Sequence, residues 1–249
     1  MYYCCGITDK GVMKHNEDAY MISDRVLTEG NIDVMLSPPF LAAVSDGVSG
    51  ERYGEIASRK CLEFLSRIQF DSGTDLKKAV MNVHRDLYDY GIQDNKTKNM
   101  QATLCAIAID ENDNLYTVNV GDSRMYRYRR GDIKQISRDQ SLVQLLYEEG
   151  TITADEKKTH VHKNIIFPVM GNVSAEPKPD VKNLHEIMKY GDLILICSDG
   201  LSDYVSSTEM EDILDLPVRL PKRLEKLVKL AIENGSQDNI TIVALCCYD

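Results

Sequence analysis

Leu41-Ala42-Ala43-Val44-Ser45-Asp46-Gly47 is an apolar run that stops at an Asp-Gly pair and is followed by a helix-like pattern. The same order of residue types returns in Leu193-Ile194-Leu195-Ile196-Cys197-Ser198-Asp199-Gly200. Continuous apolar runs of this length predict strands that are buried on both faces. Each strand would therefore carry a carboxylate on a rigid mount at its carboxyl end. A lone Asp-Gly is ordinary turn chemistry, but its repetition suggests that these mounts hold metal ions.

The composition is that of an ordinary globular protein. Of the 249 residues, 43% are hydrophobic and 27% are charged, and no stretch resembles a linker. That balance supports a sizeable core, so we expect one domain over residues 1–249 that needs no disulfide or structural metal. The seven cysteines form no C-x-x-C spacing, which argues against a disulfide framework or a zinc knuckle and indicates a reducing compartment.

Charge and hydropathy narrow the range of partners. The formal net charge is -10 and the pI is about 5.0, which disfavours nucleic acid because a phosphate backbone demands a basic surface. An acidic site holds a phosphate substrate only where bound cations reverse the local sign of charge. The amino terminus lacks a signal-peptide pattern, and no run approaches the ~18 apolar residues of a membrane span. We therefore expect no membrane contact and a cytoplasmic location.

The apolar periodicity predicts runs of strands with paired helices between them, which favours an α+β layered sandwich over an alternating parallel fold. The expected strands cover residues 2–8, 19–22, 31–36, 40–44, 103–109, 115–120, 125–128, 192–197 and 240–246, and the expected helices begin at Glu51 and at a Thr74 cap and cover residues 207–214 and 221–233. Residues 101–136 resemble a meander of consecutive antiparallel strands. Residues 138–171, here named the flap, form a long segment of weak periodicity after a short helix at Leu142.

Five aspartates share one kind of position, at the start or end of an expected strand: Asp18, Asp46, Asp122, Asp199 and Asp238. If these strand ends converge, the carboxylates repel one another unless they are protonated or neutralised by cations. Oxygen ligands without a matching set of histidines or thiols favour Mg²⁺ or Mn²⁺ over zinc or copper. Two such ions about 3.5–4 Å apart can share a bridging hydroxide, the usual nucleophile for hydrolysing a phosphate ester.

Five short motifs occur in the order and approximate spacing of the PPM family, the metal-dependent type 2C protein phosphatases, bacterial subgroup. They are Asn16-Glu17-Asp18-Ala19, Ser45-Asp46-Gly47, Val120-Gly121-Asp122-Ser123-Arg124, Ser198-Asp199-Gly200-Leu201 and Asp238-Asn239-Ile240-Thr241. The sequence resembles this family over nearly its whole length. The resemblance implies a four-layer α-β-β-α sandwich of the α+β class. Two central antiparallel sheets would be flanked by paired helices, with a dinuclear metal centre in the cleft between the sheets.

The resemblance also implies a role for individual residues. The implied metal ligands are Asp18, Asp46, Gly47, Asp122, Asp199 and Asp238. Asp46 would bridge two Mn²⁺ or Mg²⁺ ions, and the Gly47 carbonyl would bind one of them. Asp199 and Asp238 would hold the other ion, and Asp122 with Asp199 resembles a third metal site.

Around these ligands, Asp18 and Glu17 would act mainly through metal-bound waters, and Asn239 adjoins Asp238 in the last motif. The four residues that carry the implied reaction are Asp18, Asp46, Asp199 and Asp238. In that reaction the bridging hydroxide attacks phosphoserine or phosphothreonine in a protein directly, without a phosphoenzyme. The implied partners are phosphorylated proteins and a bacterial-type serine/threonine kinase that produces them.

Three departures from the family pattern bear on efficiency and substrate. The phosphate-binding arginine of the first motif is replaced by Met13-Lys14, and Lys14 offers a point charge without a two-pronged geometry. We therefore expect weaker phosphate binding, although Lys14 is alternatively a solvated loop residue. The histidine expected after Asp46-Gly47 is missing from Val48-Ser49-Gly50-Glu51. His15, His160 or a metal-bound water would then protonate the leaving group.

The third departure lies in the flap, where Gln140, Val161, Lys163, Phe167 and Pro168 replace expected residues. Flaps vary with substrate, so these changes point to a particular partner. Two other functions stay open. One is a catalytically silent relative that binds phosphoproteins or regulators, and the other is a hydrolase of small phosphate monoesters.

Overall fold

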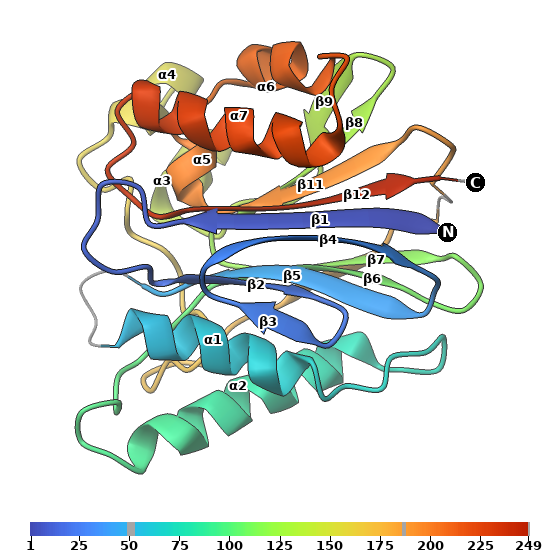
Figure 1. The fold of residues 1–249 in the computed structure, drawn as a ribbon. Coiled ribbons are helices and arrows are strands. Elements are labelled where there is room, and N and C mark those ends of the chain that lie inside the picture. Colours follow the sequence, from blue (N-terminus) through green and yellow to red (C-terminus); the bar gives the residue numbers. More distant parts are fainter. Residues whose placement is uncertain (49–52, 186–187, 249) are drawn as a thin grey trace.

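Two six-stranded antiparallel sheets form the centre of the computed structural model, which describes residues 1–48, 53–185 and 188–248 (Figure 1). The first sheet has the strand order β4-β1-β12-β11-β8-β9, and the second has the order β10-β7-β6-β5-β2-β3. The strands of the first sheet are β1 (Tyr2–Asp9), β4 (Gly30–Leu36), β8 (Arg124–Arg129), β9 (Asp132–Gln135), β11 (Leu193–Cys197) and β12 (Ile240–Cys247). Those of the second are β2 (Asp18–Ile22), β3 (Arg25–Leu27), β5 (Phe40–Asp46), β6 (Leu104–Ile109), β7 (Leu115–Val120) and β10 (Asp180–Asn183).

Helices cover the outer face of each sheet. The helices are α1 (Gly54–Leu65), α2 (Leu76–Ile92), α3 (Leu142–Glu148), α4 (Ala154–Thr159), α5 (Asp199–Ser202), α6 (Ser207–Leu214) and α7 (Leu220–Glu233). In Figure 1, α6 and α7 lie above the first sheet and α1 and α2 below the second, while α3, α4 and α5 gather at the end of the molecule away from the two termini. This is the expected four-layer α-β-β-α sandwich.

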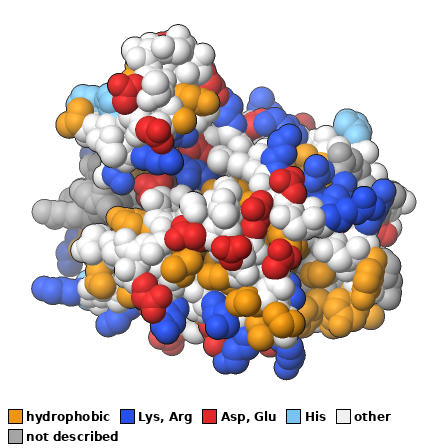
Figure 2. Space-filling model, turned by 90° about the horizontal axis from the view of Figure 1, so that it is seen from above, with side chains coloured by type: hydrophobic (Ala, Val, Ile, Leu, Met, Phe, Trp, Pro, Cys, Tyr) orange, Lys and Arg blue, Asp and Glu red, His pale blue; other side chains and the backbone are white. Residues whose placement is uncertain are grey.

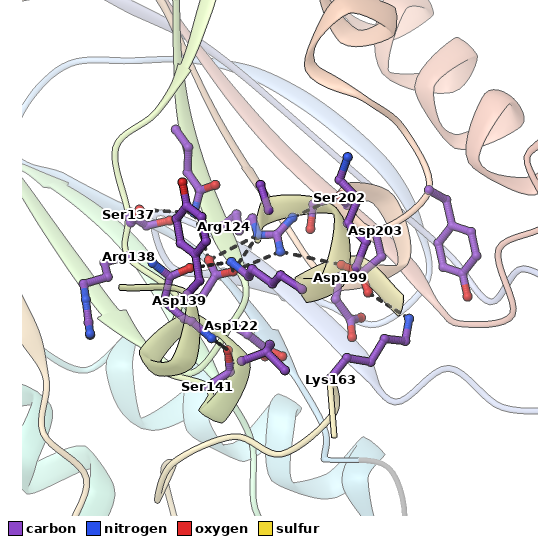
Figure 3. A pocket seen from close by; sticks show the side chains of 18 of the residues that line it. Asp122, Arg124, Ser137, Arg138, Asp139, Ser141, Lys163, Asp199, Ser202 and Asp203 are labelled. Carbon is purple, nitrogen blue, oxygen red and sulfur yellow. Dashed lines mark hydrogen bonds and ion pairs between the residues drawn. The ribbon is translucent and has the colours of Figure 1, made fainter. Parts of the chain in front are cut away.

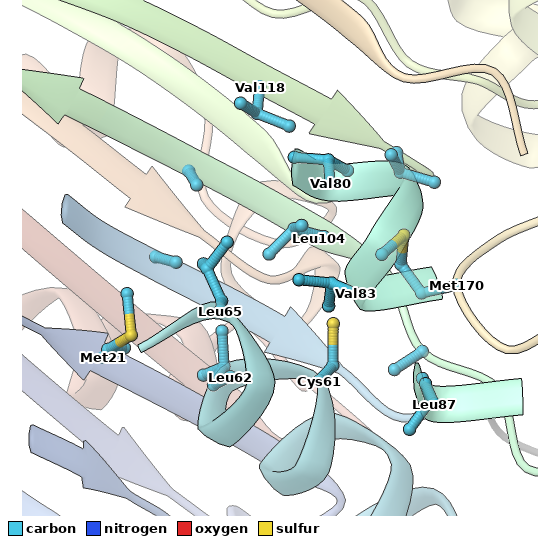
Figure 4. Close-up of a cluster of buried hydrophobic side chains, with 14 of the residues drawn as sticks. Met21, Cys61, Leu62, Leu65, Val80, Val83, Leu87, Leu104, Val118 and Met170 are labelled. Atoms are coloured by element: carbon cyan, nitrogen blue, oxygen red, sulfur yellow. The ribbon is translucent and has the colours of Figure 1, made fainter. Parts of the chain in front are cut away.

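Three apolar cores separate the four layers. One core lies between the two sheets, one between the second sheet and helices α1 and α2, and one between the first sheet and helices α5, α6 and α7. Figure 4 shows the second of these, where Leu62 and Leu65 of α1 and Val83 of α2 point toward the strands. Strand β5 contributes to two cores, because Ala43 faces these helices and Val44 faces the other sheet. The strand is therefore buried on both faces, as its continuous apolar run predicts.

The expected meander over residues 101–136 is wrong at one connection. Strands β6 and β7 pair in the second sheet, whereas β8 and β9 pair in the first. The chain therefore crosses between the sheets at Gly121-Asp122 instead of making a hairpin. Gly121 has a φ of 108°, and a Cβ built on it would lie 2.7 Å from the Thr103 methyl group. The crossing thus needs both the backbone freedom and the small size of glycine.

Other boundaries differ by a few residues. Helix α2 is capped by Asp75, whose side chain accepts a hydrogen bond from the Lys78 amide, and not by Thr74. The expected helix start at Glu51 lies outside the described residues, and α1 begins at Gly54. Strands β3, β9 and β10 and helix α4 have no expected counterpart, because each is short and lacks a clear apolar period.

The surface carries mixed charge. Seen from above, acidic and basic side chains are interspersed over the face that α6 and α7 cover (Figure 2). The basic residues of α7 have acidic neighbours, with Lys222 paired to Glu225 and Lys229 paired to Glu233. This pattern is typical of a solvated helix face. Within the described ranges, no helix is both long and apolar enough to cross a membrane.

Candidate metal and active site

Asp18 and Asp46 lie directly opposite each other on neighbouring strands. Strand β2 begins at Asp18, β5 ends at Asp46, and the antiparallel register pairs these two residues. The Asp18 side chain is buried, and its Oδ2 accepts a 2.7 Å hydrogen bond from the Ser198 hydroxyl, at the end of β11 in the other sheet. Asp18 therefore ties the two sheets together at the end of the sandwich.

The main chain at Asp46 is held from both sides by Thr103. The Thr103 amide donates to the Asp46 carbonyl at 2.8 Å, and the Asp46 amide donates to the Thr103 hydroxyl at 3.0 Å. The next residue, Gly47, leaves no room for a side chain, since a Cβ there would lie 2.3 Å from the Gly54 carbonyl oxygen. The Asp-Gly pair is therefore fixed where β5 turns toward α1.

Asp199 and Asp238 are brought together by close packing of α5 against the start of β12. A Cβ on Gly200 would lie 1.9 Å from the Asn239 carbonyl oxygen, so only glycine permits this approach. Asp199 is the first residue of α5, and its buried Oδ1 has no hydrogen-bond partner. A buried carboxylate oxygen without a partner is costly unless something else binds it.

Asp122 reaches the same region from the crossing between the sheets. The neighbouring Ser123 hydroxyl hydrogen bonds the Thr103 hydroxyl at 2.7 Å, so one threonine links the Asp122 turn to Asp46. The electrostatics confirm that the carboxylates are neighbours, because Asp18, Asp199, Asp238 and Asp122 all disfavour the charged form of Asp46. All five expected aspartates are thus gathered at one end of the sandwich.

Burial raises the pKa of every one of these carboxyl groups, and neighbouring carboxylates add to the rise. Burial is the larger cause at each, and it raises the pKa of Asp18 to about 7 and that of Asp122 to about 6. The pKa values of Asp46 and Asp199 lie well above the usual range, and that of Asp238 is raised. The cluster therefore binds protons, or cations in their place, more strongly than isolated carboxylates do.

The donor set fits hard divalent cations. The expected donors are carboxylate oxygens and the main-chain carbonyl of Gly47, without thiols or imidazoles, and the partnerless Asp199 Oδ1 is the kind of atom that a cation satisfies. Within the described ranges, no three His, Cys, Asp or Glu side chains already stand in an arrangement that could hold one ion.

Asn239 organises the loop that carries Lys14 and Glu17. Its Oδ1 accepts from the Glu17 amide at 2.7 Å, and its Nδ2 donates to the carbonyl oxygens of Lys10 and His15 at 3.0 and 2.9 Å. Lys14 lies exposed between the last two of these anchors. Glu17 packs beside Gly54, where a Cβ would lie 2.9 Å from its Oε2. The loop is therefore tied to the start of β12.

One further residue, which the motifs did not single out, also belongs to the site. Asp203 follows Asp199 by one helical turn, and its charge raises the pKa of Asp199, Asp122 and Asp238. Arg124 lies between Asp203 and the buried Asp139, within 3.6 and 2.9 Å of them (Figure 3). The i to i+4 spacing of Asp199 and Asp203 was the available sequence signal.

A cleft of about 650 Å³ opens beside these residues. Asp122, Asp199 and Asp203 line one part of it, and Tyr147 and Ala154 of the flap line another (Figure 3). The two candidate proton donors lie on loops: His15 is exposed, and His160 is partly buried in the flap, where its ring centre is 5.6 Å from that of His162. The cleft joins the carboxylates to the flap.

Comparisons with known proteins agree with this fold and site. Residues 16–234 match the family model described as Protein phosphatase 2C. The chain is 30% identical over 246 residues to the Serine/threonine phosphatase stp of Listeria welshimeri, covering 95% of this chain and 92% of that protein. The S. agalactiae serine/threonine phosphatase structure superposes with a TM-score of 0.83 at 26% identity, covering 99% of both chains.

A further solved structure holds metal ions. The catalytic domain of the serine threonine protein phosphatase PstP, in complex with two manganese ions, has a TM-score of 0.79 at 28% identity and covers 100% of both chains. The chain therefore belongs to the protein phosphatase 2C family of metal-dependent phosphatases. The expected class of enzyme is confirmed.

Proposed function

We propose that this protein hydrolyses phosphoserine and phosphothreonine in protein substrates, using a hydroxide that would bridge two divalent cations. The observation that carries the proposal is the cluster of Asp18, Asp46, Asp199 and Asp238, which has raised pKa values and a partnerless buried oxygen on Asp199. Asp199 and the neighbouring Asp122 line the cleft. Such a cluster is electrostatically unfavourable without cations, so it is better explained by metal binding than by structure.

The residues that would hold Mn²⁺ or Mg²⁺ are the aspartates of this cluster, and the bound cations would supply a hydroxide at neutral pH and neutralise charge on the phosphate. Asp46 and the Gly47 carbonyl would hold one cation, with Asp46 shared, and Asp199 and Asp238 would hold the other. Asp18 and Glu17 would bind water ligands. The pairs Asp122–Asp199 and Asp199–Asp203 would serve a third position.

The chain's own groups provide binding and orientation. Thr103 and Asn239 hold the main chain at Asp46 and Glu17, and Ser198 holds the Asp18 side chain, which limits reorganisation when substrate arrives. Lys14 would attract the phosphate as a point charge from its loop. The 650 Å³ cleft is larger than a phosphate group needs, and this supports a polypeptide substrate over a small monoester. The substrates would then be proteins phosphorylated by a serine/threonine kinase.

The silent-relative alternative would leave the carboxylate cluster without a function. A protein that only bound phosphoproteins would gain nothing from the electrostatic repulsion of clustered carboxylates at Asp46 and Asp199. The enzyme is therefore the stronger proposal.

Residues 1–249 would act as one domain. All seven cysteines are free, which supports a cytoplasmic location.

The decisive test is hydrolysis of a phosphoserine peptide with Mn²⁺, measured as phosphate release. Asp46→Asn is expected to lower kcat/KM by at least about 100-fold, since it removes a shared ligand charge, and EDTA is expected to abolish release. Asp24→Asn, at an exposed turn, is the matched control and should retain activity. Release that persisted in EDTA or in Asp46→Asn would contradict the metal mechanism.

A further inference from the structure

Helix α4 lies beside the cleft and buries no hydrophobic side chain against the rest of the protein. None of its six residues, Ala154–Thr159, is buried, and a helix of that length is not stable by itself. Its capping box joins Thr153 to Glu156, which satisfies its own first turn and does not fasten it to the body of the protein. The position of α4 therefore depends on polar contacts made by its side chains.

Lys157 is the residue of α4 that reaches the body of the protein. Its Nζ lies 3.1 Å from Asp139 Oδ2 and also donates to Gln144 Oε1 on α3. The side chain of Lys157 is 20% exposed and that of Asp139 only 2%, so solvent screens this ion pair less than a surface pair. The neighbouring Lys158 is 77% exposed and pairs only weakly with Asp155 on the same helix.

Asp139 is itself rigidly held. Arg124 donates to both of its oxygens, with Nη2 2.9 Å from Oδ2, and Gln135 Nε2 donates at 2.8 Å. Burial opposes its ionisation, but Arg124 and Lys157 outweigh burial and hold the pKa of Asp139 below its usual value. Asp139 is thus a fixed anion to which α4 is attached.

The same network reaches the candidate metal ligands. Arg124 Nη1 donates to the Ser202 carbonyl at 3.0 Å, at the last residue of α5, the helix that begins with Asp199 (Figure 3). A continuous chain of contacts therefore runs from Lys157 through Asp139 and Arg124 to α5. This chain sets the distance between the flap wall of the cleft and its carboxylate end.

We propose that Lys157 is a positioning residue that determines the preference for polypeptide over small phosphate substrates. Its ion pair with Asp139 holds α4 as a wall of the cleft, where the residues flanking a phosphorylated serine or threonine bind. This rests on the proposed phosphatase function. A small aryl phosphate occupies only the end of the cleft near Asp122 and Asp199, so it does not depend on α4.

The kinetic test compares Lys157→Met with Lys229→Met, at a lysine of α7 that does not line the cleft. KM and kcat are measured with Mn²⁺ on a phosphoserine peptide and on para-nitrophenyl phosphate. Lys157→Met is expected to raise the peptide KM about three- to tenfold, with kcat and both aryl phosphate constants within about twofold of wild type. Lys229→Met should match wild type on both substrates, since Lys229 is an exposed residue of α7 that pairs with Glu233. Lys157→Arg should restore most of the peptide affinity because it keeps the charge.

Hydrogen exchange over residues 142–159 gives a readout that does not depend on catalysis. The amides of α4 are expected to exchange faster in Lys157→Met and at the wild-type rate in Lys158→Met. Unchanged exchange overturns the tether, and faster exchange with an unchanged peptide KM overturns the specificity role. An equal loss of kcat/KM on the peptide and on the aryl phosphate also overturns the specificity role of Lys157. If the wild type hydrolyses neither substrate, the proposed function fails, while exchange still decides whether the tether exists.

Discussion

Thr103, a neutral residue, determines the position of the charged residue Asp46. It bonds the main chain of Asp46 through both its amide and its hydroxyl, and the hydroxyl also reaches Ser123. Ser198 has a similar part beside Asp18, and Asn239 beside Glu17. These contacts join segments far apart in the chain. The motifs predicted the carboxylates, but nothing local in the sequence marked Thr103, whose partners are brought together only by the fold.

Asn239 offers a test of this residue-scale support. Asn239→Ala removes one acceptor and two donors from the loop that carries Lys14, and three main-chain groups lose their partner. We expect a loss of about 1–3 kcal/mol in the free energy of unfolding and faster trypsin cleavage after Lys10 or Lys14. Urea denaturation and timed proteolysis measure the two effects.

The matched control is Asn95→Ala, at an exposed position away from the loop. It should show neither effect. Asn239→Asp keeps the acceptor for the Glu17 amide and loses both donors, so it should retain part of the stability but not the protection of the loop. Equal proteolysis of Asn239→Ala and wild type would contradict the anchoring role.

At the scale of elements, strands and helices were predicted correctly where the local sequence pattern and the tertiary fold favour the same secondary structure. Strands β5 and β11 face two cores each, and a run of apolar residues is sufficient to predict such a strand. The connection at Gly121 was predicted wrongly because a turn signal does not say whether the next strand joins the same sheet. Strand β10 was missed because its four residues are only partly buried.

The packing of α2 against the end of the flap depends on one buried histidine. His84 Nδ1 accepts a hydrogen bond from the Gly171 amide at 3.1 Å, next to Met170, which pairs with Ala102. Burial, with Arg85 adding to it and Glu176 opposing it, lowers the pKa of His84. A charged His84 would lose this acceptor.

His84 should therefore make stability depend on pH. Its folded pKa is below the unfolded value of about 6.5, so the unfolded chain binds more protons and stability falls as pH drops through that region. We expect Asn at this position, His84→Asn, to keep an acceptor without titrating. The difference in unfolding free energy between wild type and His84→Asn should shrink from pH 7.5 to pH 5, measured by urea denaturation. Parallel pH profiles would contradict this assignment.

At the scale of the whole molecule, the candidate site belongs to neither sheet alone. Asp18 and Asp46 belong to strands β2 and β5 of one sheet, whereas Asp199 and Asp238 adjoin β11 and β12 of the other, and Asp122 lies in the crossing between the two sheets. Sequence reasoning predicted that strand ends would converge. The resemblance to the PPM family implied a site in the cleft between the sheets, whereas the local pattern did not predict the crossing at Gly121 on which that location depends.

A cation bound there should stabilise the folded protein. With Mn²⁺ at about 100 times its Kd, the gain is ~2.7 kcal/mol, or about 5–10 °C in Tm. Protons compete for the same carboxylates, and the pKa of Asp18 is raised to about 7 and that of Asp122 to about 6. Without metal, their contribution to stability is present at low pH and lost as pH rises through 6 to 7.

The Mn²⁺-dependent rise in Tm should therefore be larger at pH 8 than at pH 5.5. Differential scanning calorimetry with and without Mn²⁺ measures it, using Asp24→Asn as the control and Asp46→Asn as the variant that should lose most of the rise. The same rise at both pH values would show that the cation binds elsewhere.

The pairing of the first strand with the last has a consequence for synthesis on the ribosome. Strand β1 lies beside β12 along its full length, from Tyr2 opposite Cys247 to Asp9 opposite Ile240. The first sheet therefore lacks an inner strand until residues 240–247 have left the exit tunnel, and such distant pairing is slow to form. Asp238 arrives in the same final stretch. A nascent chain thus cannot assemble the carboxylate site early, so dephosphorylation begins only after translation of β12.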